Sequence, residues 1–259
     1  MEVHHHSHND KRKFSHYLWE FLMLFLAVFC GFLAENFREH QVEHQRERQF
    51  MATMLEDLKS DTPILAHVVV YWADINNSID SVADAIQFPV NRTDFTKVYR
   101  HLSNALNYYG FRYNDRTISQ LKNSGGFRLV RQRDVANKII LYDQLNQNAI
   151  PNIADEHTSL YMQTLALRNK VFVQQITNEV YKRYLYTPPS PAANNWIDSM
   201  MQVYKIPLPE ETYNTIMFEF KNSLLALRKD FTNMQWGYDH EKAQMDGLIA
   251  IIQDKYQIK

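Results

Sequence analysis

Apolar side chains recur along most of this chain at the three- and four-residue spacing of an α-helix, and no segment shows the sustained alternation of a strand. One series is Leu65, Val68, Trp72, Ile75, Ile79, Val82 and Ile86. A second is Met217, Phe220, Leu224, Leu227, Phe231, Met234, Tyr238, Met245, Leu248 and Ile252, interrupted only by Glu241. The pattern predicts an all-α fold in which long helices with coiled-coil-like spacing pack into a bundle.

Shorter helices are predicted between these two series. We expect them at residues 95–106, 117–122, 135–145, 153–184 and 196–204, with Thr93 as the N-cap of the first. Gly125 and Gly126 are expected to end the second, because glycine is common just past the end of a helix. Pro63 is expected to separate the helix of residues 65–86 from the preceding segment, since proline interrupts a helix.

The most continuous apolar stretch runs from Tyr17 to Ala34, and Glu20 is its only acidic or basic side chain. As a helix these residues would extend about 27 Å, close to the roughly 30 Å hydrocarbon core of a bilayer. A buried core helix is rarely apolar around its whole circumference. A cleaved signal peptide needs a small residue where Phe32 stands. We therefore expect an uncleaved transmembrane helix, which also contains Cys30.

Basic residues set the expected orientation of this helix. Lys11, Arg12 and Lys13 directly precede it, whereas the arginines that follow it are interleaved with glutamates. By the positive-inside rule the N-terminus is cytoplasmic; in a Gram-negative bacterium the anchor lies in the inner membrane and the bulk of the chain is periplasmic. The expected organisation is a His-rich and basic leader at 1–16, a transmembrane helix at 17–34, a juxtamembrane stalk helix at 35–62 and an exported helical bundle at 63–259.

Composition narrows the function classes. The chain has 28 Lys and Arg against 29 Asp and Glu, and this net charge of −1 argues against a nucleic-acid binder, whose affinity comes from neutralising phosphates. With only 6 glycines, the sequence contains neither a P-loop nor a dinucleotide-binding glycine motif. A single cysteine excludes disulfides within the chain and cysteine-rich zinc sites. We expect no cofactor and find no Ser/His/Asp set that the sequence alone could assemble.

Three blocks of sequence carry a resemblance. Residues 18–37 place Glu20 near the start of the span, Gly31 late in it and an Asn-aromatic pair just after it. Together with residues 50–61 and 120–142, this block resembles an uncharacterised family of single-span, N-terminally anchored envelope proteins of Gram-negative bacteria. Phe37 departs from the tryptophan that is commoner at its position. The resemblance covers roughly residues 1–145 and implies location and topology, but no activity.

Two groups of histidines are candidate metal ligands. His4, His5, His6 and His8 form the His-rich leader, and neutral imidazole is a common ligand of zinc, copper and nickel. His40 and His44 flank Glu43 in the H-x-x-E-H pattern of some zinc peptidases, with both imidazoles on one helix face. The alternatives are a leader without a metal function and a solvated stalk, because the sequence identifies no third ligand for His40 and His44.

Basic residues between positions 112 and 138 form the candidate site for an anionic surface. The candidates are Arg112, Arg116, Lys122, Arg128, Arg131 and Arg133, with aromatic residues interleaved among them. Outside the cytoplasm, such a surface would fit an anionic lipid headgroup, a cell-wall polymer or an acidic protein. The alternative is a solvated face that covers an aromatic core.

Small residues in the predicted span suggest association between chains. Ala27 and Gly31 are four residues apart and allow close helix approach, which together with Glu20 favours a homo-oligomer. The leading hypothesis is a membrane-anchored, non-enzymatic helical protein that binds a protein partner or scaffolds an envelope complex. A ligand-sensing exported domain that acts through a partner is the second hypothesis. A zinc-dependent hydrolase that uses His40, Glu43 and His44 is the third.

Overall fold

The computed structural model of the chain describes residues 14–186, 195–204 and 208–258. These residues form helices and contain no strand, which confirms the predicted all-α class for the described part. The elements are α1 (Phe14–Ala85), the 3₁₀-helix η1 (Val90–Arg92), α2 (Phe95–Ala105), α3 (Arg116–Asn123), the 3₁₀-helix η2 (Gly126–Leu129), α4 (Arg133–Gln144), the π-helix η3 (Leu145–Ala149), α5 (Ile150–Val171), α6 (Gln174–Tyr186), α7 (Asn195–Val203) and α8 (Glu210–Tyr256).

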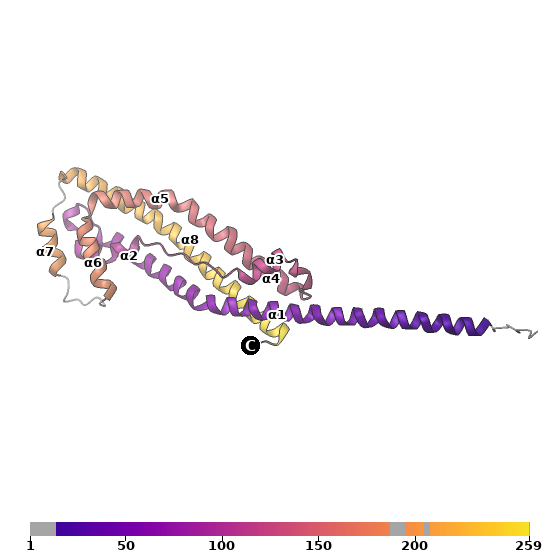
Figure 1. The fold of residues 1–259 in the computed structure, drawn as a ribbon. Helices are drawn as coiled ribbons and strands as arrows, with labels where there is room; N and C mark the ends of the chain where they lie inside the picture. The colour runs from indigo at the N-terminus through magenta and orange to yellow at the C-terminus, as the bar shows by residue number, and fades with distance from the viewer. Residues whose placement is uncertain (1–13, 187–194, 205–207, 259) are drawn as a thin grey trace, which may run out of the picture.

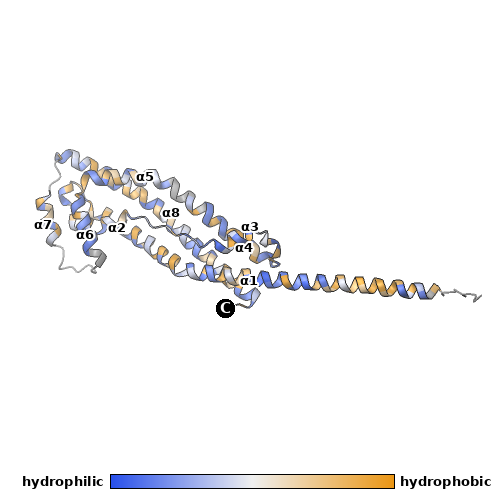
Figure 2. Ribbon diagram, in the orientation of Figure 1, coloured by the Kyte–Doolittle hydropathy of each residue, from blue (hydrophilic) through white to orange (hydrophobic). Residues whose placement is uncertain are grey.

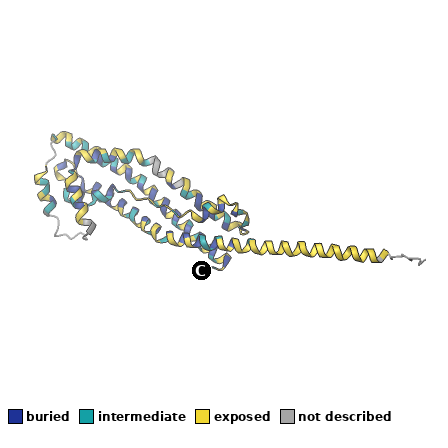
Figure 3. Cartoon of the chain, in the orientation of Figure 1, coloured by how far each residue is buried: buried dark blue, intermediate teal, exposed yellow. Residues whose placement is uncertain are grey.

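The helix α1 has two parts with different surroundings. Its side chains from His16 to Val42 are exposed, whereas burial begins at Glu47 and Met51. We call residues 14–46 the rod and the remaining described residues the bundle. Figure 3 shows the rod exposed along its length where it projects from the bundle, and Figure 2 shows that its outer half is apolar.

The rod contains the one helical stretch in the described chain that is long and apolar enough to cross a membrane, by length and composition. A window of 18 residues in this helix has a mean hydropathy of 2.0, and none of it is buried. The core helix of a soluble protein would instead have its apolar face covered by neighbouring elements. The exposed apolar stretch includes the segment 17–34 that the sequence predicts as a span.

Three long helical segments form the bundle: the inner part of α1, the helix α8, and the succession α4–η3–α5 (Figure 1). The helix α8 packs against both α1 and α5. The helices α2, α6 and α7 gather at one end, which we call the tip, and α3, η2 and α4 lie at the other end, the base, where the rod enters (Figure 1). Because α8 runs back along α1, the C-terminus lies beside α1 at the base.

The two apolar series read from the sequence form the core. All seven residues of the first series, from Leu65 to Ile86, and all ten apolar residues of the second series, on α8, are buried. Between them Trp72 packs edge-to-face on Phe231, with ring centroids 4.9 Å apart. The Nε1–H of Trp72 donates to the carbonyl of Tyr109 at 2.9 Å, so this buried indole has a partner for its polar group.

The predicted helix boundary at Pro63 is wrong, because α1 continues through this residue to Ala85. Pro63 is exposed, and so is Lys59, whose carbonyl loses its helical donor. The interruption therefore faces solvent, and α1 changes direction within the bundle (Figure 1), as expected of a helix that contains an interior proline. Residues 47–62, expected as part of a stalk, belong to the bundle.

The single helix predicted at residues 153–184 is two helices, α5 and α6. Where they separate, the carbonyl of Val171 accepts a hydrogen bond from the hydroxyl of Tyr213 at 2.9 Å. The N–H of Val173 donates to the hydroxyl of Tyr99 at the same distance. Tyrosines from α2 and α8 thus satisfy backbone groups that the break releases, and helical spacing within residues 153–184 could not reveal them.

The predicted N-cap of α2 is also wrong by one residue. Asp94, not Thr93, caps the helix, since its Oδ1 accepts from the N–H of Lys97 at 2.9 Å. The hydroxyl of Thr93 instead bonds both backbone groups of Gln87 at 3.1 Å. Both residue types are good caps, and the conformation of the preceding loop decides between them.

Candidate functional site at the junction of rod and bundle

Buried carboxylates gather where the rod enters the bundle. Glu47, Asp57 and Asp61 lie on α1 and are only 1%, 2% and 4% exposed. Carboxylates are almost never fully buried unless they are paired or hydrogen-bonded. The partners of these three side chains therefore define the junction.

Glu47 joins three elements. Its Oε1 accepts from the backbone N–H of Arg131 at 2.8 Å and from the hydroxyl of Tyr256 at 2.6 Å. Its Oε2 lies 3.4 Å from Nδ1 of His44. Burial, together with the hydrogen bond to Glu47 and its charge, raises the pKa of Tyr256, so the phenol remains a donor. Since Arg131 precedes α4 and Tyr256 ends α8, Glu47 fixes both elements to α1.

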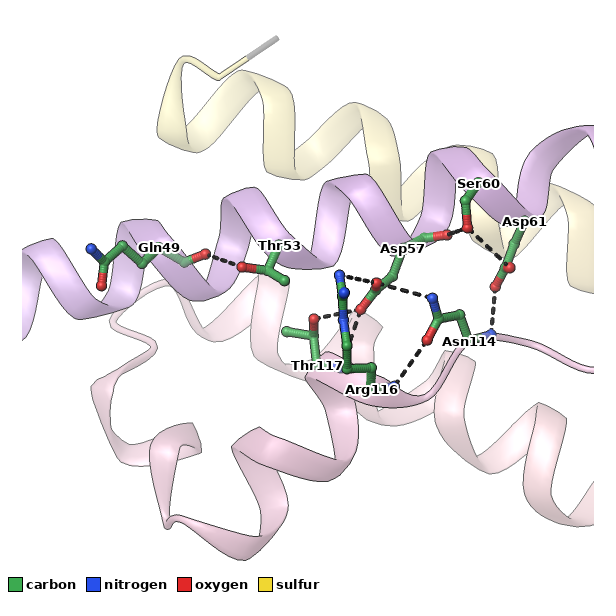
Figure 4. A network of polar contacts seen from close by, with 8 residues as sticks. All are labelled: Gln49, Thr53, Asp57, Ser60, Asp61, Asn114, Arg116 and Thr117. Atoms are coloured by element: carbon green, nitrogen blue, oxygen red, sulfur yellow. Dashed lines mark hydrogen bonds and ion pairs between the residues drawn. The ribbon is translucent and has the colours of Figure 1, made fainter.

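Asp57 caps α3 from a different helix (Figure 4). Its Oδ2 accepts from the backbone N–H of Thr117 at 3.2 Å and from the hydroxyl of Thr117 at 2.5 Å. Its Oδ1 accepts from Nη2 of Arg116 at 2.6 Å and from Nδ2 of Asn114 at 3.1 Å. Thr117 is in the first turn of α3, so Asp57 satisfies one of its free N–H groups and places a negative charge at the positive end of the helix.

Asp61 lies one turn further along α1 and holds the same loop. Its Oδ2 accepts from the backbone N–H of Asn114 at 2.6 Å, so Asn114 bridges Asp57 and Asp61 (Figure 4). Burial raises the pKa of Asp61, the charge of Asp57 adds to this, and the hydrogen bond from Asn114 opposes it. The loop between α2 and α3 is therefore attached to α1 by two carboxylates.

Half of the predicted basic cluster is used in contacts within the bundle. Three of its six members are paired with carboxylates: Arg116 with Asp57, Lys122 with Asp143, and Arg131 with Glu43 and Glu47. Arg112, Arg128 and Arg133 form no side-chain ion pair with other described residues, and all three are exposed. The candidates thus lie within one region but do not present six free charges to an anionic partner.

The H-x-x-E-H pattern lies at the same junction. The Nδ1 of His40 is 3.9 Å from Glu43, and the carbonyl of His40 accepts from Nη2 of Arg131 at 3.3 Å. Within the described residues, no group of three His, Cys, Asp or Glu side chains is arranged to hold a metal ion, so His40 and His44 gain no third ligand there. The other candidates, His4, His5, His6 and His8, lie outside the described residues.

A cavity of 620 Å³ lies between the rod and η2. Arg38 and Arg46 line it from the rod, and Arg128 lines it from η2, with glutamates of the rod interleaved. Gly125 enters this turn at a φ of 68°, a left-handed conformation that glycine adopts without strain. Arg128 of the predicted basic cluster therefore lines the same cavity as Arg38 and Arg46 of the rod. The sequence pattern did not predict that these three arginines lie together.

The residues predicted to pack in the membrane lie together on the rod. Glu20, Ala27 and Gly31 are exposed, and Ala27 and Gly31 share one helix face. A Cβ built on Gly31 would meet no atom within 4 Å. This face of the rod is thus open to another helix.

Sequence reasoning missed the residues that fix the junction, Glu47, Asp57, Asp61 and Tyr256. The available signal was weak: Asp57 and Asp61 are acidic residues four apart beside an apolar stripe that includes Leu58. Such a pair is common on a solvated helix face. Comparison with family models, with curated proteins and with solved structures gives no match for this chain, so its function is inferred from its own geometry.

Proposed function

We propose that this chain is a single-span protein of the inner membrane whose rod crosses the bilayer and whose bundle is a non-enzymatic scaffold for a partner protein on the periplasmic side. The observation that carries the proposal is the exposed apolar helix that continues without interruption into the core of the bundle. About a dozen large apolar side chains between Leu18 and Leu33 are open to the surroundings. At roughly 2 kcal/mol for each side chain, moving them from water into lipid is worth on the order of 20 kcal/mol.

The continuous helix also sets the position of the bundle. Residues 35–46 separate the predicted span from Glu47, which corresponds to about 18 Å of helix. The headgroup layer on one side of a bilayer is roughly 5–7 Å thick, so the base of the bundle would stand just beyond it. The basic residues at 11–13 favour a cytoplasmic N-terminus and therefore a periplasmic bundle.

A stripe on α8 supports the proposed partner. Phe218, Leu225 and Trp236 are 54%, 44% and 66% exposed, and their spacing of seven and eleven residues places them on one helix face. The carboxylates at the junction are instead occupied by structural contacts, which favours a binding role over a catalytic one. An apolar strip on the exposed side of a helix fits the apolar face of a partner helix.

Topology and anchoring are tested in native membranes. A reporter that is active only after export, fused after Lys259, is expected to be active, and the chain is expected to resist extraction by alkali without detergent. A chain released by alkali, or a reporter active only in the cytoplasm, would contradict the anchor and its orientation respectively.

The partner is tested by placing a photoreactive residue at Trp236 in the full chain and irradiating membranes. The expected result is one defined crosslinked protein that is absent when the photoreactive residue replaces Glu219, which is exposed on another face of α8. Equal crosslinking from both positions, or none from Trp236, would contradict a partner site on the stripe.

A cavity of 270 Å³ supports the ligand-sensing alternative. It lies between α5 and α8 and is lined mainly by apolar side chains, with His157 at its wall. The Nδ1 of His157 lies 2.8 Å from Asp230, so a histidine–aspartate contact stands beside an apolar space of the size of a small ligand. A concentration-dependent rise in melting temperature with a small amphipathic ligand would favour the sensor, and its absence across a ligand panel would favour the scaffold.

A further inference from the structure

Glu241 occupies a core position of α8 with no partner for its charge. Its side chain is 0% exposed, and neither carboxylate oxygen has a hydrogen-bond partner among the described residues. Glu47 is equally buried but accepts hydrogen bonds from Arg131 and Tyr256. Glu241 therefore lacks the well-formed hydrogen bonds that Glu47 receives, and the amide of Asn146 is the group near it that favours its charged form.

The groups that face Glu241 come from three sides. Asp61 faces it from α1, Tyr142 from α4 and Asn146 from η3, while Tyr238 lies on α8 itself. No cationic side chain is among these four, and Asp61 carries the same charge as Glu241. An ionised Glu241 would therefore have no compensating charge and would be repelled by Asp61.

The neighbouring polar groups are mostly occupied elsewhere. The amide of Asn146 donates to the carbonyl of Tyr142 at 2.9 Å, and the hydroxyl of Tyr238 accepts from the N–H of Phe111 at 3.3 Å. The hydroxyl of Tyr142 is buried without a partner. It is close enough to Glu241 for the two groups to interact electrostatically, but it forms no hydrogen bond with either carboxylate oxygen.

We infer that Glu241 is a proton-binding site that controls the contact of α8 with α1 and the α4–η3 segment. With its proton bound, the neutral carboxyl packs in the core, and the contact is closed. Loss of the proton leaves a buried carboxylate without a partner, and the base of the bundle loosens. The inference concerns the bundle alone and is independent of whether the rod crosses a membrane.

The direction of the pH dependence follows from the environment. Burial raises the pKa of Glu241 from 4.5 to about 8, Asp61 adds to this shift, and the nearby amide of Asn146 opposes it. A folded-state pKa above the unfolded one means that the stabilisation is complete below the unfolded value and is lost as pH rises through the folded value. The loss therefore falls between pH 4.5 and about 8.

The π-helix η3 makes the loosening local. It interrupts the succession from α4 to α5 and carries Asn146, whose amide interacts with Glu241; such single-turn insertions often occur where a helix serves a function. Burial raises the pKa of Tyr238 to about 12 and that of Tyr142 further, so neither phenol ionises in the range where Glu241 does.

The test is hydrogen exchange of the full chain in detergent micelles at pH 6 and pH 9, with labelling times scaled for the intrinsic exchange rate. Peptides covering residues 139–150 and 238–252 are expected to lose about tenfold to a hundredfold in protection at pH 9. Unchanged protection of these peptides in the wild-type chain would overturn the inference.

Two variants identify the group responsible. Glu241→Gln keeps the shape of the side chain without its ionisation, and its protection is expected to be the same at both pH values. Glu219→Gln removes an exposed carboxylate from the same helix and is expected to behave as the wild type. A pH-dependent loss in Glu241→Gln equal to that of the wild type would assign the effect to another group and overturn the inference.

The wild-type chain also provides an internal control. Peptides of α2, at the tip, are expected to keep their protection at pH 9, because Glu241 interacts with Tyr142 of α4, and α4 lies at the base (Figure 1). Equal loss at the tip and the base would mean that alkaline pH unfolds the whole bundle, which would overturn a local role for Glu241.

Discussion

Replacement of Asp57 by alanine tests whether one carboxylate holds α3 on α1. The change leaves the N–H and the hydroxyl of Thr117 without an acceptor, and Thr117 is only 1% exposed. Each buried polar group left without a partner costs about 1–3 kcal/mol. Arg116 and Asn114 also lose an acceptor, but both are exposed and can turn to solvent.

The expected loss for Asp57→Ala is therefore about 3–4 kcal/mol in the free energy of unfolding, within the range for breaking one side of a buried charged pair. For a domain of this size, 1 kcal/mol corresponds to roughly 2–4 °C, so the melting temperature should fall by about 6–16 °C. Asp57→Asn keeps one oxygen acceptor for Thr117 and loses the charge, so we expect about half of this effect.

The measurement is thermal unfolding of the full chain in detergent micelles, followed by circular dichroism at 222 nm. Asp84→Ala serves as the matched control, because Asp84 is an exposed aspartate of the same helix, and a change within about 0.5 kcal/mol is expected there. If Asp57→Ala and Asp84→Ala melt within 2 °C of one another, Asp57 does not cap α3, and α3 is held on α1 by other contacts.

Three further changes probe other parts of the structure. Tyr256→Phe removes the 2.6 Å hydrogen bond to Glu47 and should cost about 1 kcal/mol, with faster hydrogen exchange confined to the last turns of α8; unaltered exchange there would show that this bond does not hold the C-terminus. Gly125→Ala forces a side chain into a left-handed conformation at φ 68° and should lower stability by about 1–2 kcal/mol in a urea titration, so a neutral result would contradict the turn geometry. Tyr99→Phe removes the acceptor for the N–H of Val173 and should cost about 1 kcal/mol with increased exchange at the start of α6, whereas a continuous helix across this point would leave exchange unchanged.

Much of the fold follows from neighbouring residues alone. The spacing of Leu65 to Ile86 and of Met217 to Ile252 determines two helices and the faces they bury, because apolar side chains three and four residues apart lie on one side of a helix. The run from Tyr17 to Ala34 likewise determines an exposed apolar helix. These properties depend on contacts within a few residues, so the sequence contains them directly.

The junction was decided by the tertiary structure, because its contacts join residues far apart in the chain. Asp57 and Thr117 are 60 residues apart, and Glu47 and Tyr256 are 209 apart. A local pattern cannot show that Arg116 and Arg131 are neutralised by such partners, so six basic residues resembled one charged surface.

Glu241 shows most clearly which properties the sequence determined and which depend on the tertiary structure. The sequence by itself determined that an acidic residue interrupts an apolar series on α8. Only the tertiary structure decided that Asp61 and Tyr142, rather than a cation or solvent, face that residue. The physical reason is that burial and neighbouring charge fix the energy of an ionised group, and both arise only when distant segments pack together.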